Sequence, residues 1–219
     1  MLKVDKYDLA DVLLGVDRPT IATLDDLNVV ATELTLAFAD DPMFTWLLGE
    51  RSERELASFK LFQALVRDIG YASGTIYRPG AGGAAAIWIP SERLGYSSYY
   101  EHLRMLPKVI IATGIIPLWR LMATQRALDR HHPRKESHSY LSFFGVHPAL
   151  QGRGIGSRLL RACLKLVDDQ ARAAFLETST QSTIQFYHRF GFEVTEVYNV
   201  RPGAPPIWTM WRPRNVPNS

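Results

Sequence analysis

A glycine-rich segment between an uncharged run and an amphipathic pattern constrains this chain most. Residues 146–157 read VHPALQGRGIGS, with glycine at positions 152, 154 and 156. The residues just before, 139–146, include Tyr, Leu and Phe and carry no charge, which is typical of a strand covered on both faces. Apolar side chains then recur on one face of a helix: Ile155, Leu159, Ala162, Cys163 and Leu166. The segment therefore predicts a connection from a buried strand to a helix.

Such a connection favours an anion. Because glycine has no side chain, the backbone N–H groups of residues 152–157 can approach a ligand closely, and the helix dipole adds about half a positive charge at the same place. Arg153 adds a direct charge, and Arg158 is a further candidate. We expect a pyrophosphate there. The alternative is a tight turn whose glycines only allow the helix to pack closely on the sheet.

Three phosphate-binding motifs compete for this segment. A Walker loop needs Gly-Lys-Ser/Thr, which is missing, and the dinucleotide motif G-x-G-x-x-G needs glycine where Ser157 or Leu159 stands. The remaining pattern, Gln-x-x-Gly-x-Gly after a strand, resembles the coenzyme A pyrophosphate loop of the GNAT acetyltransferase superfamily. The resemblance extends through residues 175–179 and 186–194. Together with residues 132–136, these segments are most similar to the puromycin N-acetyltransferase-like members.

The order of the elements agrees with this resemblance. The later half predicts strand, helix, strand, helix and a final hairpin of residues 192–200 and 207–212. Earlier, a helix begins at Thr23 with Asp26 completing a capping box, and the Asp41-Pro42 pair ends it. Three further predictions follow along the chain: a helix from Ser52, a hairpin of strands 75–78 and 84–89, and broken helices over 91–137.

The resemblance implies an α/β GNAT fold, with a mixed, mostly antiparallel central sheet whose parallel strands splay apart and whose faces carry helices. We expect one N-acetyltransferase domain over residues 1–219. Its acceptor-side helices would lie in residues 20–75 and 91–130, and its acetyl-CoA-binding core in residues 138–213.

The same resemblance implies direct transfer of an acetyl group from acetyl-CoA to an amine, without a covalent enzyme intermediate. Cys163 fits this, because its place on an apolar stripe is typical of a structural thiol. Thr183 stands where the family often has asparagine, and Ser179 or Ser182 could replace that contact. The predicted coenzyme-binding residues are Phe144, Gly145, Val146, Gln151, Gly152, Arg153, Gly154, Ile155, Gly156, Ser157 and Thr183.

Two residues are predicted to be catalytic. Tyr187, four residues before Gly191, matches the family's usual general acid toward the coenzyme thiolate. The alternative is a core tyrosine with a bonded hydroxyl. Glu177, at the end of its strand, is the first choice for the base that deprotonates the amine. Asp40, Asp41, His138 and a chain of waters are the other candidates, and each carboxylate could instead be a cap or a loop residue.

The acceptor pocket is predicted around the segment 40–46, read as a loop between the first two helices. A carboxylate beside aromatic walls suits a cationic amine that carries an aromatic group. The alternative is that Phe44 and Trp46 only pack the helices together. The predicted acceptor-side residues are Asp40, Asp41, Phe44, Trp46, Trp88 and Tyr140.

Composition excludes several other classes. The chain has 25 Lys plus Arg against 22 Asp plus Glu, a net charge of +3 from scattered residues, which favours a small anionic ligand over nucleic acid. One cysteine allows neither an internal disulfide nor a cysteine-based zinc site. His131, His132 and His138 lack a carboxylate at ligand spacing, so we expect no metal.

The expected setting is the cytoplasm. The first ten residues carry four charges, and the apolar run 109–119 has 11 residues where a spanning helix needs about 20. We therefore expect no secretory signal and no membrane span. The predicted partner is a small-molecule amine, with the oligomeric state open. The alternative functions are acetylation of a protein Lys or N-terminus, and a non-catalytic acyl-CoA sensor.

Overall fold

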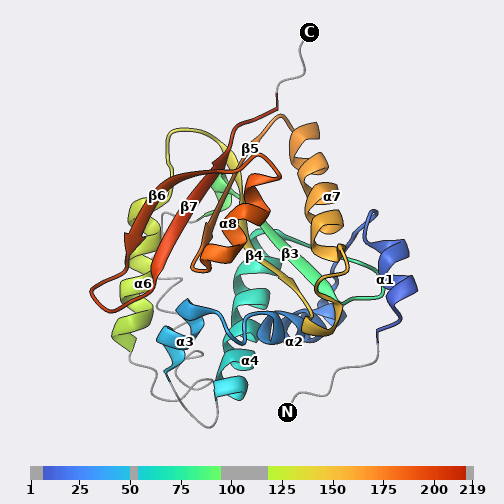
Figure 1. The fold of residues 1–219 in the computed structure, drawn as a ribbon, viewed down its shortest axis with the longest axis horizontal. Helices are drawn as coiled ribbons and strands as arrows, with labels where there is room; N and C mark the ends of the chain where they lie inside the picture. Colours follow the sequence, from blue (N-terminus) through green and yellow to red (C-terminus); the bar gives the residue numbers. More distant parts are fainter. Residues whose placement is uncertain (1–6, 50–53, 95–117, 216–219) are drawn as a thin grey trace.

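The computed structural model describes residues 7–49, 54–94 and 118–215. Over these residues the chain forms a seven-stranded sheet in the order β1-β2-β3-β4-β5-β7-β6 (Figure 1). Every neighbouring pair is antiparallel except β4 and β5, which are parallel. The strands are β1 (Thr20–Ile21), β2 (Thr75–Arg78), β3 (Ala84–Pro90), β4 (His138–Val146), β5 (Ala173–Thr178), β6 (Glu193–Asn199) and β7 (Pro206–Arg212).

Helices cover both faces of the sheet. In chain order they are α1 (Leu9–Gly15), α2 (Leu27–Ala37), α3 (Pro42–Leu48), α4 (Arg54–Leu65), α6 (Leu118–His131), α7 (Ile155–Asp169) and α8 (Gln181–His188). One core cluster holds residues of α2, α3 and α4, and the other holds residues of α1 and α7. Side chains of β3 alternate between the two, with Ile87 in the first cluster and Trp88 in the second. This burial on both sides explains the uninterrupted apolar sequence of the strand.

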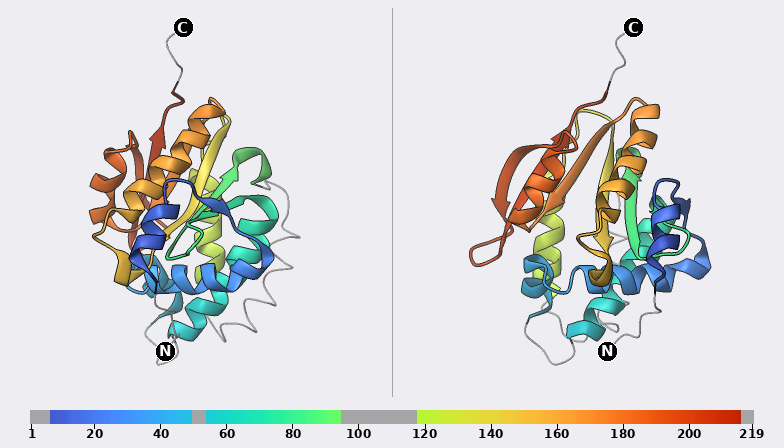
Figure 2. Two further views of the ribbon diagram at one scale, coloured as in Figure 1. Left: turned by 90° about the vertical axis from the view of Figure 1, so that its right-hand side faces the viewer. Right: turned by 45° about the vertical axis from the view of Figure 1, so that its right-hand side comes forward.

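The parallel strands β4 and β5 are paired over only the first part of β4 and then separate. They pair from His138 and Ala173 to Leu141 and Leu176, and beyond Leu141 the strand β4 stays paired only with β3. The right-hand view of Figure 2 shows the two strands diverging. The predicted fold, a mostly antiparallel sheet with splayed parallel strands between helices, is confirmed.

The capping interaction predicted at the start of the first helix is present before α2. Thr23 and Asp26 form the predicted capping box, with the Thr23 backbone N–H donating to Asp26 at 2.8 Å. The box opens a single 3₁₀ turn, Leu24–Asp26, before the α-helix begins at Leu27.

Residues 40–46 are not the predicted loop. The segment becomes α3, because the Asp41 carboxylate caps the backbone N–H groups of Met43 and Phe44 at 2.9 and 3.0 Å. Pro42 occupies the first helical position, where its missing N–H costs nothing. The Asp-Pro pair, which predicts the end of one helix, therefore also begins the next.

Other elements were missed or lie outside the described residues. The sequence patterns did not indicate α1 or β1. Helix α4 is present and continues into a π-helical segment, Val66–Tyr71, although its predicted start at Ser52 lies outside the described residues. Of the predicted broken helices, α6 is described, and residues 95–117 are outside the described part of the chain.

Candidate active site

One cleft joins most of the predicted site residues. It has a volume of about 910 Å³ and extends from the glycine loop, past the splay of β4 and β5, to side chains of α2, α3 and α6. Arg153, Trp46 and Trp88 do not line it. The predicted residues that do are Asp40, Asp41, Phe44, Tyr140, Phe144, Gly145, Val146, Gln151, Gly152, Gly154, Ile155, Gly156, Ser157, Glu177, Thr183 and Tyr187.

The glycine loop presents backbone to the cleft. Gly152 and Gly154 have φ angles of 73° and 78°, in the left-handed region that favours glycine. Apart from the glycines and their chain neighbours, no heavy atom of the described residues lies within 4 Å of where a Cβ would be on either residue. Their side of the loop is therefore open, and a side chain would fill the space that a ligand needs.

The first turn of α7 is available to an anion. No side chain caps this helix, and its first internal bond runs from the N–H of Arg158 to the carbonyl of Gly154 at 3.0 Å. The preceding N–H groups, at Ile155, Gly156 and Ser157, have no intrahelical partner. Together with the open glycines, they fit the pyrophosphate of a coenzyme.

Arginine side chains bring less positive charge to this end of the cleft than the sequence indicated. Arg158 is occupied elsewhere, since its Nε donates to Asp17 at 2.9 Å and its Nη2 to the carbonyl of Leu13 at 2.8 Å. Arg153 is exposed. Gln151 has a structural role, because its side-chain amide donates to the carbonyl of Val146 at 3.0 Å and ties the loop to β4. The groups that this end of the cleft offers to an anion are therefore chiefly main chain.

The splay exposes one edge of β4. From Ser142 to Val146 the strand has β3 on one side and, within the described part of the chain, no strand on the other. All five of these residues line the cleft. Backbone groups that point to the open side are available to a ligand between the strands.

Tyr187 lies on α8 at the wall of the cleft. Its side chain is 9% exposed, and its ring packs against Phe186 and Phe192 at centroid distances of 5.2 and 6.0 Å. Burial raises the pKa of its hydroxyl above the usual value. Because that hydroxyl makes no hydrogen bond to another described residue, its proton remains available to a ligand.

Thr183 uses its hydroxyl within the protein. The group donates to the carbonyl of Thr180 at 2.7 Å and lies 2.8 Å from the hydroxyl of Thr178. Of the two serines considered as substitutes, Ser179 donates to Asp41 at 2.7 Å, whereas Ser182 is exposed. The hydroxyls of this loop mainly hold α8 to β5 and α3.

Glu177 is held by two tyrosines. Its Oε2 accepts from the hydroxyl of Tyr140 at 3.0 Å, and its Oε1 accepts from the hydroxyl of Tyr198 at 2.9 Å. Burial raises the pKa of the carboxyl to about 7, although both hydrogen bonds act in the opposite direction, and the charge of Asp129 adds to the rise. A carboxyl with this pKa can accept a proton near neutral pH.

Sequence reasoning missed Tyr198. The residue lies on β6, an edge strand whose other residues are mostly exposed. Nothing in that local pattern distinguishes it, and only the strand order β5-β7-β6 brings it within reach of Glu177.

At the end of the cleft that is predicted to hold the acceptor, both carboxylate oxygens of Asp41 have hydrogen-bond partners. One carboxylate oxygen caps α3, and the other accepts from Ser179 at 2.7 Å and from Thr180 at 3.3 Å. Asp40 is exposed at the edge of the cleft. Phe44 both lines the cleft and packs the helices, since its ring stacks on Phe62 of α4 at 4.8 Å.

The two predicted tryptophans lie elsewhere. Trp46 contacts α6, where its carbonyl accepts from Arg120 at 2.6 Å and its ring meets Trp119 at 5.9 Å. Trp88 is 5% exposed and points to the α7 side of the sheet, in the cluster that contains Cys163. Its position on β3 decided this, because neighbouring strand residues face opposite sides.

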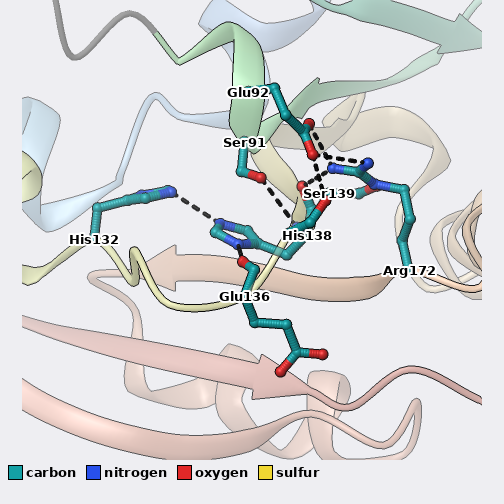
Figure 3. Close-up of polar contacts among 8 residues, drawn as sticks. Ser91, Glu92, His132, Glu136, His138, Ser139 and Arg172 are labelled. Atoms are coloured by element: carbon teal, nitrogen blue, oxygen red, sulfur yellow. Dashed lines mark hydrogen bonds and ion pairs between the residues drawn. The ribbon is translucent and has the colours of Figure 1, made fainter.

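His138 is not placed to act as the base. It is fully buried, with Nδ1 2.7 Å from the carbonyl of Glu136 and Nε2 2.9 Å from Nε2 of His132. Figure 3 shows it in a network that also holds Glu92 and Arg172, and none of these three residues lines the cleft. Burial lowers the pKa of both histidines, that of His132 to about 4. Within the described ranges, no three His, Cys, Asp or Glu residues gather as metal ligands do.

Comparisons with known proteins agree with the fold and the loop. Residues 114–194 match the family model described as an acetyltransferase (GNAT) domain. The matched segment contains β4, the glycine loop, α7, β5 and α8, and it supports transferase activity.

Solved structures of GNAT acetyltransferases share the fold. A protein described as histone acetyltransferase HPA2 and related acetyltransferase, from Corynebacterium glutamicum, is 24% identical with a TM-score of 0.67, covering 92% of this chain and 99% of its own. A Drosophila melanogaster polyamine N-acetyltransferase is 16% identical with a TM-score of 0.53 over 88% and 98%. Arylalkylamine N-acetyltransferase 2 from Aedes aegypti is 13% identical with a TM-score of 0.54 over 90% and 99%. These likenesses establish the fold, and the resemblance to puromycin N-acetyltransferase-like members stays a prediction.

Among the helices of the described residues, none combines the length and the apolar character needed to cross a membrane.

Proposed function

We propose that this protein transfers an acetyl group from acetyl-CoA directly to the amine of a small molecule. One observation carries the proposal: a single cleft connects the open glycine loop to Glu177 and Tyr187 through the gap between β4 and β5. The loop and the first turn of α7 would hold the coenzyme pyrophosphate. Acetyl-CoA, when bound, supplies the activated acyl group.

Glu177 acts as the general base. Its carboxylate takes a proton from the acceptor nitrogen, whose lone pair forms the new bond to the acyl carbon. With a pKa of about 7, Glu177 is ionised in a large fraction of molecules at neutral pH, and it binds the proton more strongly than an ordinary carboxylate does. Backbone N–H groups on the open side of Ser142–Val146 would stabilise negative charge on the carbonyl oxygen.

Tyr187 acts as the general acid. As the carbon–sulfur bond breaks, its hydroxyl gives a proton to the departing thiolate and regains one from solvent. The raised pKa keeps this hydroxyl protonated throughout the neutral range. Catalysis then depends on a short distance to the sulfur rather than on acid strength.

Cys163 supports direct transfer. Its thiol is 1% exposed within the core beneath α7, and burial raises its pKa to about 12. A thiol that is neither ionised nor accessible is a poor nucleophile. The acetyl group therefore passes to the amine without an enzyme thioester.

The acceptor end favours an amine with an apolar or aromatic body. Phe38, Phe44 and Phe143 form part of an aromatic wall there, and Glu177 provides the nearby carboxyl group. Asp40 adds negative charge at the edge. Such a pocket stabilises a cation attached to a ring.

A thiol-release assay tests the proposal. Purified protein is incubated with acetyl-CoA and a panel of arylalkylamines, alkylamines, polyamines and lysine-containing peptides, while calorimetry measures coenzyme binding. We expect thiol release with small amines that carry an apolar group. Release with peptides alone would replace this function with protein acetylation. Binding without release would indicate an acyl-CoA sensor, and the absence of binding would overturn the coenzyme assignment.

A substitution of Tyr187 tests whether this residue is the general acid. Tyr187→Phe should lower kcat by about 10- to 100-fold while coenzyme affinity stays within about two-fold. Tyr77→Phe is the matched control, because Tyr77 is a partly buried strand tyrosine packed in the α7-side core and away from the cleft. Normal turnover in Tyr187→Phe would remove Tyr187 from the mechanism.

A further inference from the structure

Tyr198 reaches Glu177 from a different part of the fold than the other tyrosine. Tyr140 lies on β4, next to β5, whereas Tyr198 lies on β6, with β7 between it and β5. Its side chain is 8% exposed, and its hydroxyl donates to Oε1 of Glu177 at 2.9 Å. Each carboxylate oxygen thus has its own phenol donor, and the two donors come from opposite sides of β5.

The ring of Tyr198 is itself held in place. The imidazole of His131, at the end of α6, stacks on it with a centroid distance of 3.8 Å and an interplanar angle of 8°. Nδ1 of His131 lies 2.9 Å from Oε2 of Glu196, also on β6. His131 therefore holds α6 against β6. The contact is made on the ring of Tyr198, whose hydroxyl donates to Glu177.

We propose that Tyr198, clamped by His131, is a positioning residue that orients the Glu177 carboxylate and favours its ionised form. This inference rests on the proposed function, in which Glu177 is the base. A phenol that donates to a carboxylate stabilises the charged form and fixes which lone pairs remain for the substrate.

The surrounding charges explain why such a donor is needed. Burial and the negative charge of Asp129 on α6 both raise the pKa of Glu177, and only the phenols of Tyr140 and Tyr198 oppose them. Burial raises the pKa of the Tyr198 hydroxyl most, the charge and hydrogen bond of Glu177 add to the rise, and Glu196 adds the least. Tyr198 therefore remains a neutral donor, and removing its hydroxyl should make Glu177 harder to ionise.

A direct titration tests this without requiring turnover. The protein is labelled with ¹³C at the side-chain carboxyl of glutamate, and the Glu177 signal is assigned by its loss in Glu177→Gln. We expect a midpoint near pH 7 in the unmodified protein. In Tyr198→Phe it should rise by about one pH unit, the size expected for one charge-assisted hydrogen bond. An unchanged or lower midpoint would overturn the proposal.

The pH dependence of kcat/KM, measured with any amine that is turned over, gives a second readout. In Tyr198→Phe the acidic limb should move upward with the titration midpoint, lowering kcat/KM by about five-fold at pH 7 and little at pH 9. A uniform loss at every pH would show a merely structural effect and contradict the proposal. Tyr77→Phe should leave both measurements unchanged.

His131 variants separate the clamp from the donor. His131→Ala should shift the Glu177 midpoint in the same direction as Tyr198→Phe but less, and His131→Phe, which keeps a flat ring, should restore it. A normal midpoint in His131→Ala would remove His131 from the proposal. Because titration needs no acceptor, a failed thiol-release assay with a shifted midpoint would reject the transferase function alone. Turnover with an unshifted midpoint would reject only this inference.

Discussion

The glycine-loop end of the cleft is made of main chain, whereas the Glu177 end is made of side chains from several distant elements. At the first, open glycines and the uncapped start of α7 present N–H groups. At the second, Glu177 of β5 meets Tyr140 of β4 and Tyr198 of β6, near side chains of α2, α3 and α6. A site built of main chain depends on local conformation, and a site built of side chains depends on packing. The two ends should therefore fail differently when they are mutated.

The largest expected effect lies at the side-chain end. Glu177→Gln should lower kcat/KM by about 10²- to 10⁴-fold, because it removes the proton acceptor, and should leave coenzyme affinity within about two-fold. Steady-state kinetics and calorimetry measure the two quantities. A comparable loss of coenzyme binding would show that the two ends are not independent.

Glu177→Gln should also change the pH dependence of the free energy of unfolding. The folded-state pKa of Glu177, about 7, lies above its usual value of 4.5, so the folded protein becomes less stable as pH rises between these values. Glu177→Gln should therefore be more stable than the unmodified protein at pH 8, by about 1–3 kcal/mol, and lose this advantage near pH 4. Urea unfolding at both pH values measures this difference, and an equal difference at pH 4 and pH 8 would show that the pKa of Glu177 is not raised.

The next effect lies at the main-chain end. Gly154→Val should weaken coenzyme binding by about 100-fold, because a β-branched residue disfavours φ = 78° and its side chain fills the open space. Gly203→Val is the matched control, with φ = 83° and equally open surroundings in the β6–β7 turn. Calorimetry should show normal affinity in the control. Equal losses in both variants would mean that backbone strain, and not the binding site, caused the effect.

A smaller effect is expected at the start of α3, on the side-chain end of the cleft. Asp41→Ala removes the cap of α3 and the bonds to Ser179 and Thr180. It should cost about 1–2 kcal/mol of unfolding free energy and raise the acceptor KM about ten-fold. Asp40→Ala, which removes an exposed neighbour, should leave stability unchanged. If only Asp40→Ala raised the KM, the edge carboxylate and not the capping one would hold the acceptor.

The smallest effect concerns Cys163. Cys163→Ala should keep kcat within about two-fold and cost about 1–2 kcal/mol of stability through the lost packing. Iodoacetamide should leave the unmodified protein active at pH 7, because the thiol is buried and its pKa is about 12. Loss of turnover in Cys163→Ala without unfolding would point to a covalent intermediate.

Much of the fold could be predicted because its signals are local. The two hairpins, the uncharged strand β4 and the stripe on α7 each lie within a short window, and both hairpins pair in antiparallel fashion as predicted. The glycine loop belongs with them, since conformation and N–H groups are properties of consecutive residues. The segment 40–46 was mistaken for a loop because Asp41 and Pro42 can end one helix and begin the next.

The sequence by itself determined the main-chain end of the cleft, whose glycines, strand and helix start are neighbours along the chain. Tertiary structure alone decided the side-chain end. It brought Tyr198 to Glu177 across β7, turned Trp88 toward α7, and committed Asp41 and Arg158 to structural bonds. The physical reason is that a backbone site needs only a local conformation, whereas a raised pKa and a paired carboxylate need burial and partners from distant parts of the chain.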